Sequence, residues 1–473
     1  MNKFPSNRHL ALVPLLAALV LAGCATGPAI LPASLPITPP VFKEAAGPAT
    51  SIHSSDTVAT SPAQAQGQWW QIFSDPVLNQ LVEQANHNNN SIQVAAARLA
   101  QARAIAGLTD ASRALQVGLS TSAVRQRDTT TEYVPQTLVS AGVNLSYEVD
   151  LFGKLSKASD AATLDANSRD ALLHSTQLLV QAEVAQTYLS LRAIDSERTL
   201  VRDTLKAYRN TLQLTEVRFK EGDVAELDVV RVRSEVASTE SDALALDQRR
   251  AQLEHTLAVL VGEVASSFQV QPTQWATALP AIPAGVPSTV LTRRPDVSAA
   301  QSSMQAAQAR VGVAKAAWFP SFSLTANGGY AAPEIKDLFS ASTRAWGLGA
   351  LLSLPLFDGG KREAGVLSAN AELDMALASY REQVLVAFRE VEDQLSSLRL
   401  LAEQSEAQSR SVASSSRATQ LSDSRYRNGF VSQLELLDAQ RSELRNRRQA
   451  LQVRAAQYQA TVGLIRALGG GWA

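Results

Sequence analysis

The sequence is poor in several residue types, and each shortage excludes a class of protein. Its 473 residues include a single cysteine, at position 24, which excludes an internal disulfide framework and a cysteine-rich metal site. The five histidines are scattered and form no pair at the i, i+4 spacing of a helical metal site. The formal net charge of −1 gives no support for nucleic-acid binding. Beyond position 24 there is no run of about 20 apolar residues, so we expect no transmembrane helix.

The motifs of common enzyme classes are missing as well. The stretches FGK (152–154) and DGGK (358–361) lack the first glycine of a phosphate-binding loop. No G-x-S-x-G nucleophile elbow occurs. We therefore expect no catalytic residue, no cofactor and no enzymatic activity.

Residues 1–23 predict an export signal. Lys3 and Arg8 precede an apolar run at 10–21, which is too short to span a bilayer and is typical of a secretory signal. The run ends in LAGC, which resembles the lipobox at which bacterial lipoproteins are cleaved and lipidated. On this interpretation Cys24 carries acyl chains that anchor the mature chain to membrane lipid; the alternative is an ordinary buried cysteine. Position 25 is alanine and not aspartate, which resembles the signal that sorts bacterial lipoproteins to the outer membrane.

Residues 24–66 predict an extended, lipid-anchored tether. The segment is rich in proline, alanine, serine and threonine and has no hydrophobic periodicity. We expect this segment only to span the distance between the lipid anchor and the folded body.

The remainder of the chain contains an internal repeat with an offset of 207 residues. The stretch LTEVRFKEGDVAELDVV (214–230) aligns with LSDSRYRNGFVSQLELL (421–437), and 14 of the 17 pairs are identical or chemically similar. The match extends over two copies, 67–262 and 284–473, which a proline-rich linker at 263–283 joins. A period of this size indicates a domain-scale duplication and not a solenoid of short repeats.

Each copy predicts the same order of elements: a helix, two strands, a very long helix and a returning helix. Alternation of apolar residues, as in Trp346, Leu348 and Ala350, predicts strands with one apolar face. The predicted strands are 115–125, 138–149, 321–330 and 346–357, and the predicted long and returning helices are 154–219, 225–262, 361–427 and 432–467. A helix of this length would be a rod of about 100 Å.

The apolar residues of the long helices predict coiled-coil packing. Val384, Phe388, Val391 and Leu395 are spaced by 4, 3 and 4 residues, which is a heptad rhythm. Helices alone would also fit an exported coiled-coil stalk without a pore. The strands favour a pore, because four strands cannot close a membrane barrel and three copies would supply 12. The predicted fold is therefore mainly α: an antiparallel coiled-coil α-barrel with a transmembrane β-barrel to which each chain gives four strands.

Several motifs in this order resemble one family. They are LAGC, WWQIFSDPVLNQLVEQA (69–85), the QAR helices, LFDGGKR (356–362) and two copies of R-[FY]-x-x-G-x-V-x-x-L. The chain resembles the TolC-like outer membrane factors, in the branch of OprM/NodT-like efflux lipoproteins. The resemblance implies a homotrimer in the bacterial outer membrane, with a helical tunnel in the periplasm. It also implies passive export of drugs or other small molecules, in partnership with a periplasmic adaptor (membrane fusion) protein and an inner-membrane RND-type pump. A conduit for protein secretion is the alternative.

The resemblance also implies a gate at the periplasmic end. In the family the second copy narrows this end with an apolar ring and acidic rings, which here map to Leu434, Glu435 and Asp438. Three carboxylates at one axis would repel one another and favour cations. A link between Tyr426 and Asp228 is the expected fastening. The chain departs from TolC at Val431, where TolC has an arginine, so we expect the closed state to depend more on the packing of Leu434.

The two hairpin turns are the expected contact for the adaptor. Gly222 and Gly429 stand where each long helix must reverse, a place for a residue that tolerates positive φ. Arg218 and Arg425 precede them by one turn and would complement the helix dipole. By resemblance the adaptor contact comprises Arg218, Phe219, Gly222, Arg425 and Gly429; the alternative is that the motif is only a well-built turn.

Overall fold

The computed structural model describes residues 40–44, 67–127, 135–273, 275–277, 279–283, 290 and 293–471. They fall into two compact units. The first contains Arg98–Asp170 and Ala299–Glu382, and the second contains Thr38–Ala97, Ala171–Ser298 and Gln383–Ala473, with the gaps just given. Each unit thus takes segments from both halves of the chain. In the described part of the chain, every helix is too short or too polar to be a candidate membrane span.

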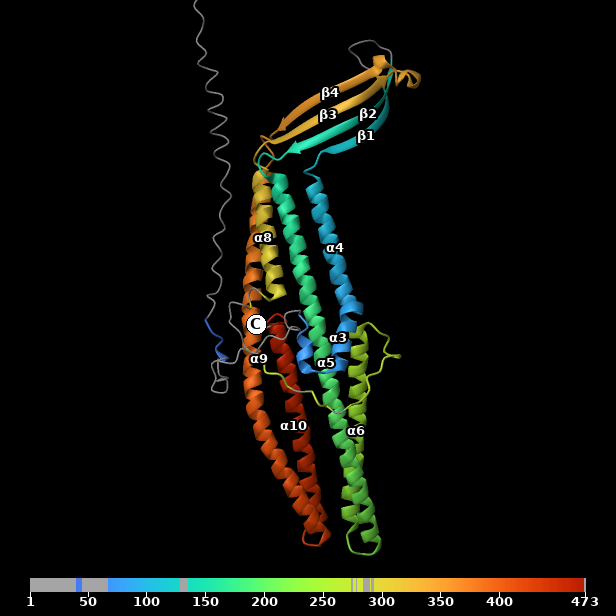
Figure 1. The fold of residues 1–473 in the computed structure, drawn as a ribbon, viewed down its shortest axis with the longest axis vertical. Coiled ribbons are helices and arrows are strands. Elements are labelled where there is room, and N and C mark those ends of the chain that lie inside the picture. Colours follow the sequence, from blue (N-terminus) through green and yellow to red (C-terminus); the bar gives the residue numbers. More distant parts are fainter. Residues whose placement is uncertain are drawn as a thin grey trace, which may run out of the picture. The chain divides into compact units, whose positions relative to one another are not determined.

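The first unit contains an antiparallel sheet of four strands in the order β1-β2-β3-β4 (Figure 1). The strands are β1 (Gln116–Gln126), β2 (Gln136–Val149), β3 (Ser321–Ala332) and β4 (Arg344–Ser353). The central pair β2 and β3 joins the two halves of the chain, with Val139 opposite Ala332 and Val149 opposite Phe322. β4 ends four residues before the predicted end at Phe357, because Pro355 has no N–H for the ladder. β1 and β4 are the edge strands of the described sheet.

The register divides the sheet into an apolar face and a polar face. Residues opposite one another on neighbouring strands share a face, and successive residues alternate between faces. The apolar face comprises Val117, Leu119, Val139, Val143, Leu145, Phe322, Leu324, Trp346, Leu348 and Leu352. The more polar face includes Ser120, Ser122, Ser140, Asn144, Ser323, Thr325, Asn327 and several glycines, together with Glu148, Val124, Leu138 and Leu351. On the apolar face, Leu119 is 80% exposed and Trp346 is 79% exposed, so one chain leaves this face uncovered.

The sheet is joined to helices that the first unit shares with the second. These helices are α4 (Asn90–Ala111), α5 (Lys154–Lys220), α8 (Pro295–Ala316) and α9 (Lys361–Arg427). Within the first unit the Ser168 hydroxyl on α5 donates to the carbonyl of Ala299 on α8 at 3.0 Å and lies 2.8 Å from the Ser303 hydroxyl. Small side chains therefore let these two helices approach closely.

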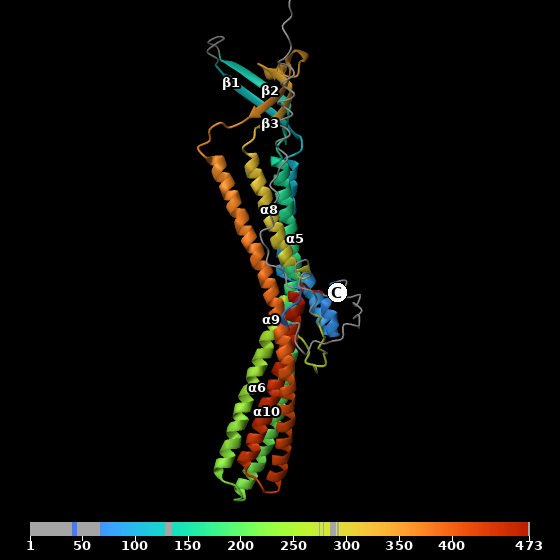
Figure 2. The same cartoon turned by 90° about the vertical axis from the view of Figure 1, so that its left-hand side faces the viewer.

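Two helical hairpins form most of the second unit (Figure 2). The first hairpin is α5 with α6 (Glu226–Val261), and the second is α9 with α10 (Gln433–Ala467). α5 and α9 each have 67 residues, and their first residues, Lys154 and Lys361, stand 207 positions apart.

The two hairpin turns are built in the same way. Gly222 has a φ of 81° and Gly429 a φ of 76°, which confirms the positive φ expected at both positions. In the first turn the Asp223 N–H donates to the Arg218 carbonyl at 2.8 Å, and in the second the Phe430 N–H donates to the Arg425 carbonyl at 2.9 Å. This is the bond of a Schellman motif, which satisfies carbonyls that a helix end leaves free.

The hydrophobic core of the second unit includes the paired tryptophans. Trp69 and Trp70 are only 1% and 3% exposed, so they pack in the core and do not lie at an exposed surface. The Trp69 indole N–H donates to Gln181 at 3.1 Å, which satisfies its one polar atom. Asp75 begins helix α3 (Pro76–Asn88) by accepting from the N–H of Val77 at 3.0 Å.

Candidate functional site

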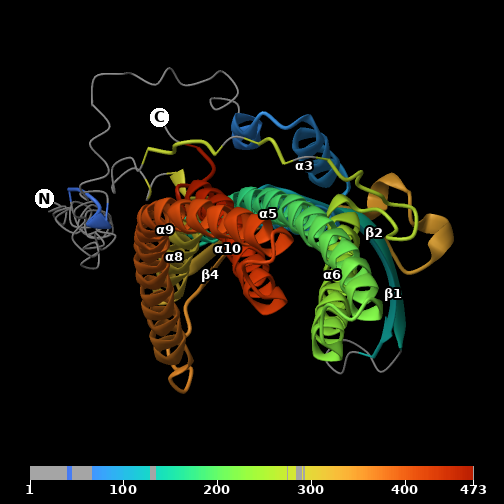
Figure 3. The same cartoon turned by 90° about the horizontal axis from the view of Figure 1, so that it is seen from below.

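The turn end of the two hairpins contains the predicted gate and adaptor-contact residues. Figure 3, viewed from below, shows the two hairpins side by side, with α10 next to α5. Cys24, the predicted lipidation site, lies outside the described residues.

The predicted gate residues Leu434, Glu435 and Asp438 lie on one exposed side at the start of α10. Leu434 is 41% exposed and the Asp438 side chain is 62% exposed, whereas the intervening Leu436 and Leu437 are buried. Leu434 and Asp438 are one helical turn apart and therefore share a face. The Ser432 hydroxyl accepts from the Glu435 N–H at 3.3 Å and caps the helix. An apolar and acidic strip is thus held at a capped helix start.

Tyr426 does not reach Asp228 within the chain. Its hydroxyl donates instead to Oε1 of Gln433, and Asp228 lies 3.8 Å from Arg231 on its own helix. The reason is local: Gln433 begins α10 just beyond the turn that follows Tyr426, so it is the nearer partner. Within one chain Tyr426 therefore bonds Gln433, which the sequence did not single out, and the Tyr426–Asp228 link stays a prediction for the assembled channel.

Gln433 lies buried where both hairpins meet. It is 4% exposed, and its Oε1 also accepts from the Thr215 hydroxyl of α5 at 3.3 Å. The Arg218 guanidinium, also on α5, lies 5.1 Å from the centre of the Tyr426 ring, a cation–π distance. Arg218 is therefore engaged inside the chain and is only half-exposed.

Two arginines of α10 connect the hairpins by ion pairs. Arg441 Nε donates to Glu235 of α6 at 2.7 Å, and the guanidinium lies 3.6 Å from Asp438. Arg448 binds Glu197 of α5 at 2.7 Å and Asp242 of α6 at 2.9 Å. We call these contacts, with those of Tyr426, Gln433 and Leu437, the internal joint. Asp438 therefore has a cation nearby, which reduces the repulsion expected between acidic rings.

The internal joint also buries Tyr208. This α5 residue is fully buried and packs with Val232 and Leu437. Burial raises the pKa of the Tyr208 hydroxyl, and the nearby Glu235 carboxylate acts in the same direction. Tyr208 therefore stays neutral at physiological pH.

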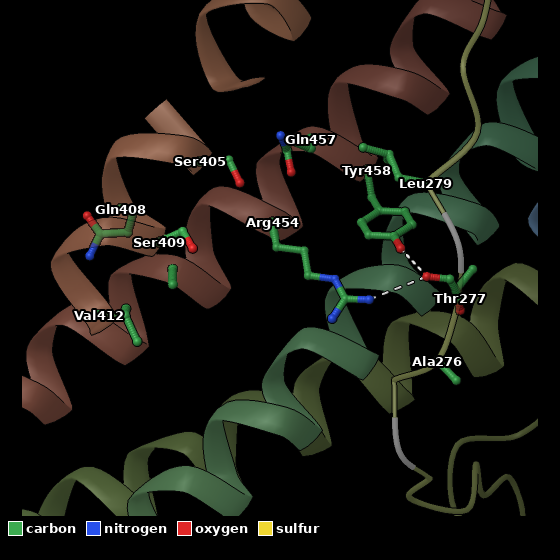
Figure 4. Close-up of a pocket in the computed structure, with 11 residues that line it drawn as sticks. Ala276, Thr277, Leu279, Ser405, Gln408, Ser409, Val412, Arg454, Gln457 and Tyr458 are labelled. Carbon is green, nitrogen blue, oxygen red and sulfur yellow. Dashed lines mark hydrogen bonds between the residues drawn. The ribbon is translucent and has the colours of Figure 1, made fainter. Parts of the chain in front are cut away.

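A cavity of about 610 Å³ lies where residues 275–277 and Leu279 pass α9 and α10 (Figure 4). Arg454 stacks on the Trp275 ring at 4.6 Å and donates to the Thr277 carbonyl at 3.4 Å, and the Tyr458 hydroxyl donates to the same carbonyl. These contacts hold the segment against α10. In the described part of the chain no group of three His, Cys, Asp or Glu side chains could hold a metal ion.

Comparisons with known proteins identify the family. The model of the outer membrane efflux protein family matches residues 81–263 and 286–470. The pyoverdine export outer membrane protein OpmQ of Pseudomonas putida is 33% identical over 98% of this chain and 98% of its own length. The probable efflux pump outer membrane protein TtgC of the same species is 34% identical over 96% of this chain and 94% of its own. The solved outer-membrane channel OprN has a TM-score of 0.86 at 31% identity, over 95% of this chain and all of that chain. The chain therefore belongs to the outer membrane efflux protein family, as its resemblance to TolC-like factors predicted.

Proposed function

We propose that this chain is the outer-membrane channel of a tripartite efflux system and that it exports small molecules passively. The observation that carries the proposal is the match of nearly the whole chain to proteins named for export and efflux through the outer membrane. The protein is not an enzyme, so an inner-membrane pump must supply the energy. The named export of pyoverdine by a relative favours small molecules over the secretion of proteins.

The sheet supports a barrel shared among copies. One chain offers four strands with two edges, and a backbone edge exposed to lipid would leave N–H and C=O groups without partners. Pairing β1 of one copy with β4 of the next removes every edge, and a homotrimer gives a barrel of 12 strands. The apolar face would then meet lipid. The other face, which is rich in Ser, Thr, Asn and Gly and also carries Glu148, would line the lumen.

The duplication supports a ring of similar hairpins below the barrel. Both long helices have 67 residues and end in the same Schellman turn. Three chains would supply six such hairpins around one tunnel that lies in the periplasm. The turns would face the adaptor protein. Of the proposed contacts, Phe219, Gly222, Arg425 and Gly429 are exposed, whereas Arg218 already packs on Tyr426.

The gate proposal rests on the exposed strip of α10. In a trimer, Leu434 would form an apolar ring, and Glu435 and Asp438 would form acidic rings that favour cations. A Tyr426–Asp228 link would have to form on assembly, since in the single chain Tyr426 bonds Gln433.

Reconstitution tests the function directly. We expect the purified, lipidated protein to be a trimer in detergent and to give discrete single-channel conductance in a planar bilayer. A matched deletion of residues 116–149, which removes β1 and β2, should remove conductance, because the barrel cannot close. A full-length protein that is a non-conducting monomer in detergent and in liposomes would overturn the proposal.

Lipidation of Cys24 has its own test. Cys24→Ser should abolish incorporation of labelled palmitate and leave the signal uncleaved at this position, because Cys24 is the only cysteine of the chain. Mass spectrometry of the mature N-terminus provides the measurement. Ala25→Ser serves as the matched control and should remain acylated. Unchanged labelling of Cys24→Ser would exclude this residue as the lipid site.

A further inference from the structure

The cavity between α9 and α10 contains an arginine without an acidic partner. Arg454 of α10 makes no ion pair with any residue that the structure describes, whereas Arg441 and Arg448 of the same helix each bind carboxylates. Within the described chain its guanidinium donates one hydrogen bond, to the Thr277 carbonyl at 3.4 Å, and one of its faces lies on the Trp275 ring (Figure 4). Because a guanidinium has several N–H donors, most of those of Arg454 remain available.

The internal repeat shows what the same place contains in the first hairpin. Asp247 of α6 is the counterpart of Arg454, 207 positions earlier. It accepts a hydrogen bond from Arg198 of α5 at 2.6 Å and two from Arg202 of α5 at 2.8 and 2.9 Å. One carboxylate therefore joins two guanidiniums between the two helices of this hairpin.

The second hairpin has neither the long side chains nor the acid of that cluster. The counterparts of Arg198 and Arg202 in α9 are Ser405 and Ser409, which line the cavity together with Arg454. Serine is much shorter than arginine, so a space is left between α9 and α10. These replacements give a cavity of about 610 Å³ that contains one positive charge without a counter-ion.

We infer that this cavity binds a small organic carboxylate on Arg454. The ligand does for Arg454 what Asp247 does for Arg198: a planar anion accepts N–H bonds from a guanidinium, a geometry that carboxylates match well. The hydroxyls of Ser405 and Ser409 make no hydrogen bond within the described chain, so they are free to donate to the same anion.

The rest of the lining defines the body of the ligand. Leu279, Val412 and the Tyr458 ring give the cavity apolar surface, and no acidic side chain of the described chain lines it. The amide nitrogens of Gln408 and Gln457 donate to backbone carbonyls of α10 and α9, at 2.9 and 3.2 Å, so these two side chains are already held in place. A carboxylate on a short apolar chain or ring therefore fits, and the volume lies within the range of small-molecule sites, about 300–1,000 Å³.

Fluorine NMR on the full-length protein in detergent tests the site. The probe is fluorophenylbutanoate, and the uncharged fluorophenylbutanamide measures how far the same body partitions into micelles. We expect saturable binding of the carboxylate and none of the amide. Arg454→Gln should weaken binding by about ten-fold or more, because it removes a hydrogen-bonded ion pair. Arg445→Gln is the matched control and should leave the affinity unchanged, since it removes an exposed arginine of α10 that does not line the cavity.

A second variant keeps Arg454 and its contact with Thr277 in place. Ser405→Glu gives the cavity a carboxylate of the protein's own, at the position from which Arg198 reaches Asp247 in the first hairpin. The new acid should pair with Arg454 and abolish binding of the probe. Ser405→Gln has the same size without the charge and should bind the probe more tightly than Ser405→Glu.

Three results would contradict the inference. Equal binding of the carboxylate and the amide would show that the cavity does not recognise the charge. Full affinity in Ser405→Glu would show that the probe binds elsewhere. Displacement of the probe by an equal concentration of inorganic phosphate would overturn the assignment to carboxylates. None of these results bears on the proposed channel, because the cavity contains no predicted gate or adaptor-contact residue and conductance tests that function separately.

Discussion

Replacing Arg294 by methionine is expected to loosen the region where α8 begins and α10 ends. Arg294 is buried with a side chain that is 6% exposed. It donates two hydrogen bonds to Asp296, at 3.0 and 2.6 Å, and one to Glu390 at 2.7 Å. It also donates to the Ala467 carbonyl at 3.2 Å. One guanidinium therefore donates hydrogen bonds to two carboxylates and to the carbonyl of the last residue of α10.

The expected cost follows from what Arg294→Met leaves behind. Methionine fills a similar volume, but Asp296 and Glu390 lose their common cation and remain about three-quarters buried. Removing one partner of a buried ion pair costs about 3–5 kcal/mol, and we take the lower figure because both acids retain some access to water. A loss of about 3 kcal/mol makes local opening roughly 100-fold more frequent. The rate of hydrogen exchange of the backbone amides near 296–300 and 464–467 measures this local opening.

The loss of local stability in Arg294→Met should depend on pH in a defined direction. Burial alone would raise the pKa of Asp296, but hydrogen bonds and the charge of Arg294 outweigh it and hold the pKa below its ordinary value of 3.8. A group with a lowered pKa in the folded state stabilises the fold above its ordinary pKa, and this stabilisation is lost as the pH falls through the folded value. The difference between the wild type and Arg294→Met should therefore be full above about pH 5 and shrink below about pH 4.

The adjacent residue provides the control. Arg293 is exposed, so Arg293→Met removes the same charge without removing a buried partner. It should leave exchange in both segments unchanged. Equal exchange in the two variants would show that the Arg294 ion pairs do not hold these segments.

Local sequence patterns predicted the elements well. The long helix expected from Lys154 to Phe219 is α5, Lys154–Lys220, because heptad spacing and the absence of proline act within a few residues. The turn glycines were predictable for the same reason, since a reversal after an uninterrupted helix requires a positive φ. Pro355 lies within the predicted fourth strand, and its missing N–H predicts that this strand ends before position 355.

Contacts between the hairpins could not be predicted in this way. Arg441 and Glu235 stand 206 positions apart, and nothing near either residue marks the other as its partner. In the sequence, nothing distinguishes Gln433 from other polar residues at a helix start. In the structure it is buried between α5 and α9, where the hydroxyls of Thr215 and Tyr426 both donate to its side-chain oxygen. The predicted partner Asp228 is half-exposed and lies beside Arg231 instead. The choice of partner depends on packing between distant segments, which a single sequence does not specify.

Widening the turn end should change conductance most. We expect Leu434→Ala with Asp438→Ala to raise single-channel conductance several-fold in a planar bilayer. Leu434 is 41% exposed and its truncation removes the proposed apolar ring, while alanine at position 438 shortens the side chain at the next turn of the same face. Removing Asp438 also frees Arg441 from a carboxylate 3.6 Å away without disturbing its bond to Glu235.

The single variants separate size from charge. Leu434→Ala should raise conductance and leave the reversal potential in a salt gradient unchanged, because no charge is altered. Asp438→Ala should shift the reversal potential toward weaker cation preference, since it removes one negative charge from each copy. Arg441 compensates part of that charge in the wild type, so the shift should be smaller than the removal of an unpaired acid would give.

The repeat supplies the control for the gate. Leu227 and Arg231 are the counterparts of Leu434 and Asp438 in the first hairpin, and Leu227 is 56% exposed. If only the second hairpin narrows the tunnel, Leu227→Ala with Arg231→Ala should leave conductance near the wild-type value, although it truncates side chains at matching positions. Equal increases in both double variants would mean that both hairpins line the constriction. No increase in the Leu434/Asp438 variant would remove the gate from the start of α10.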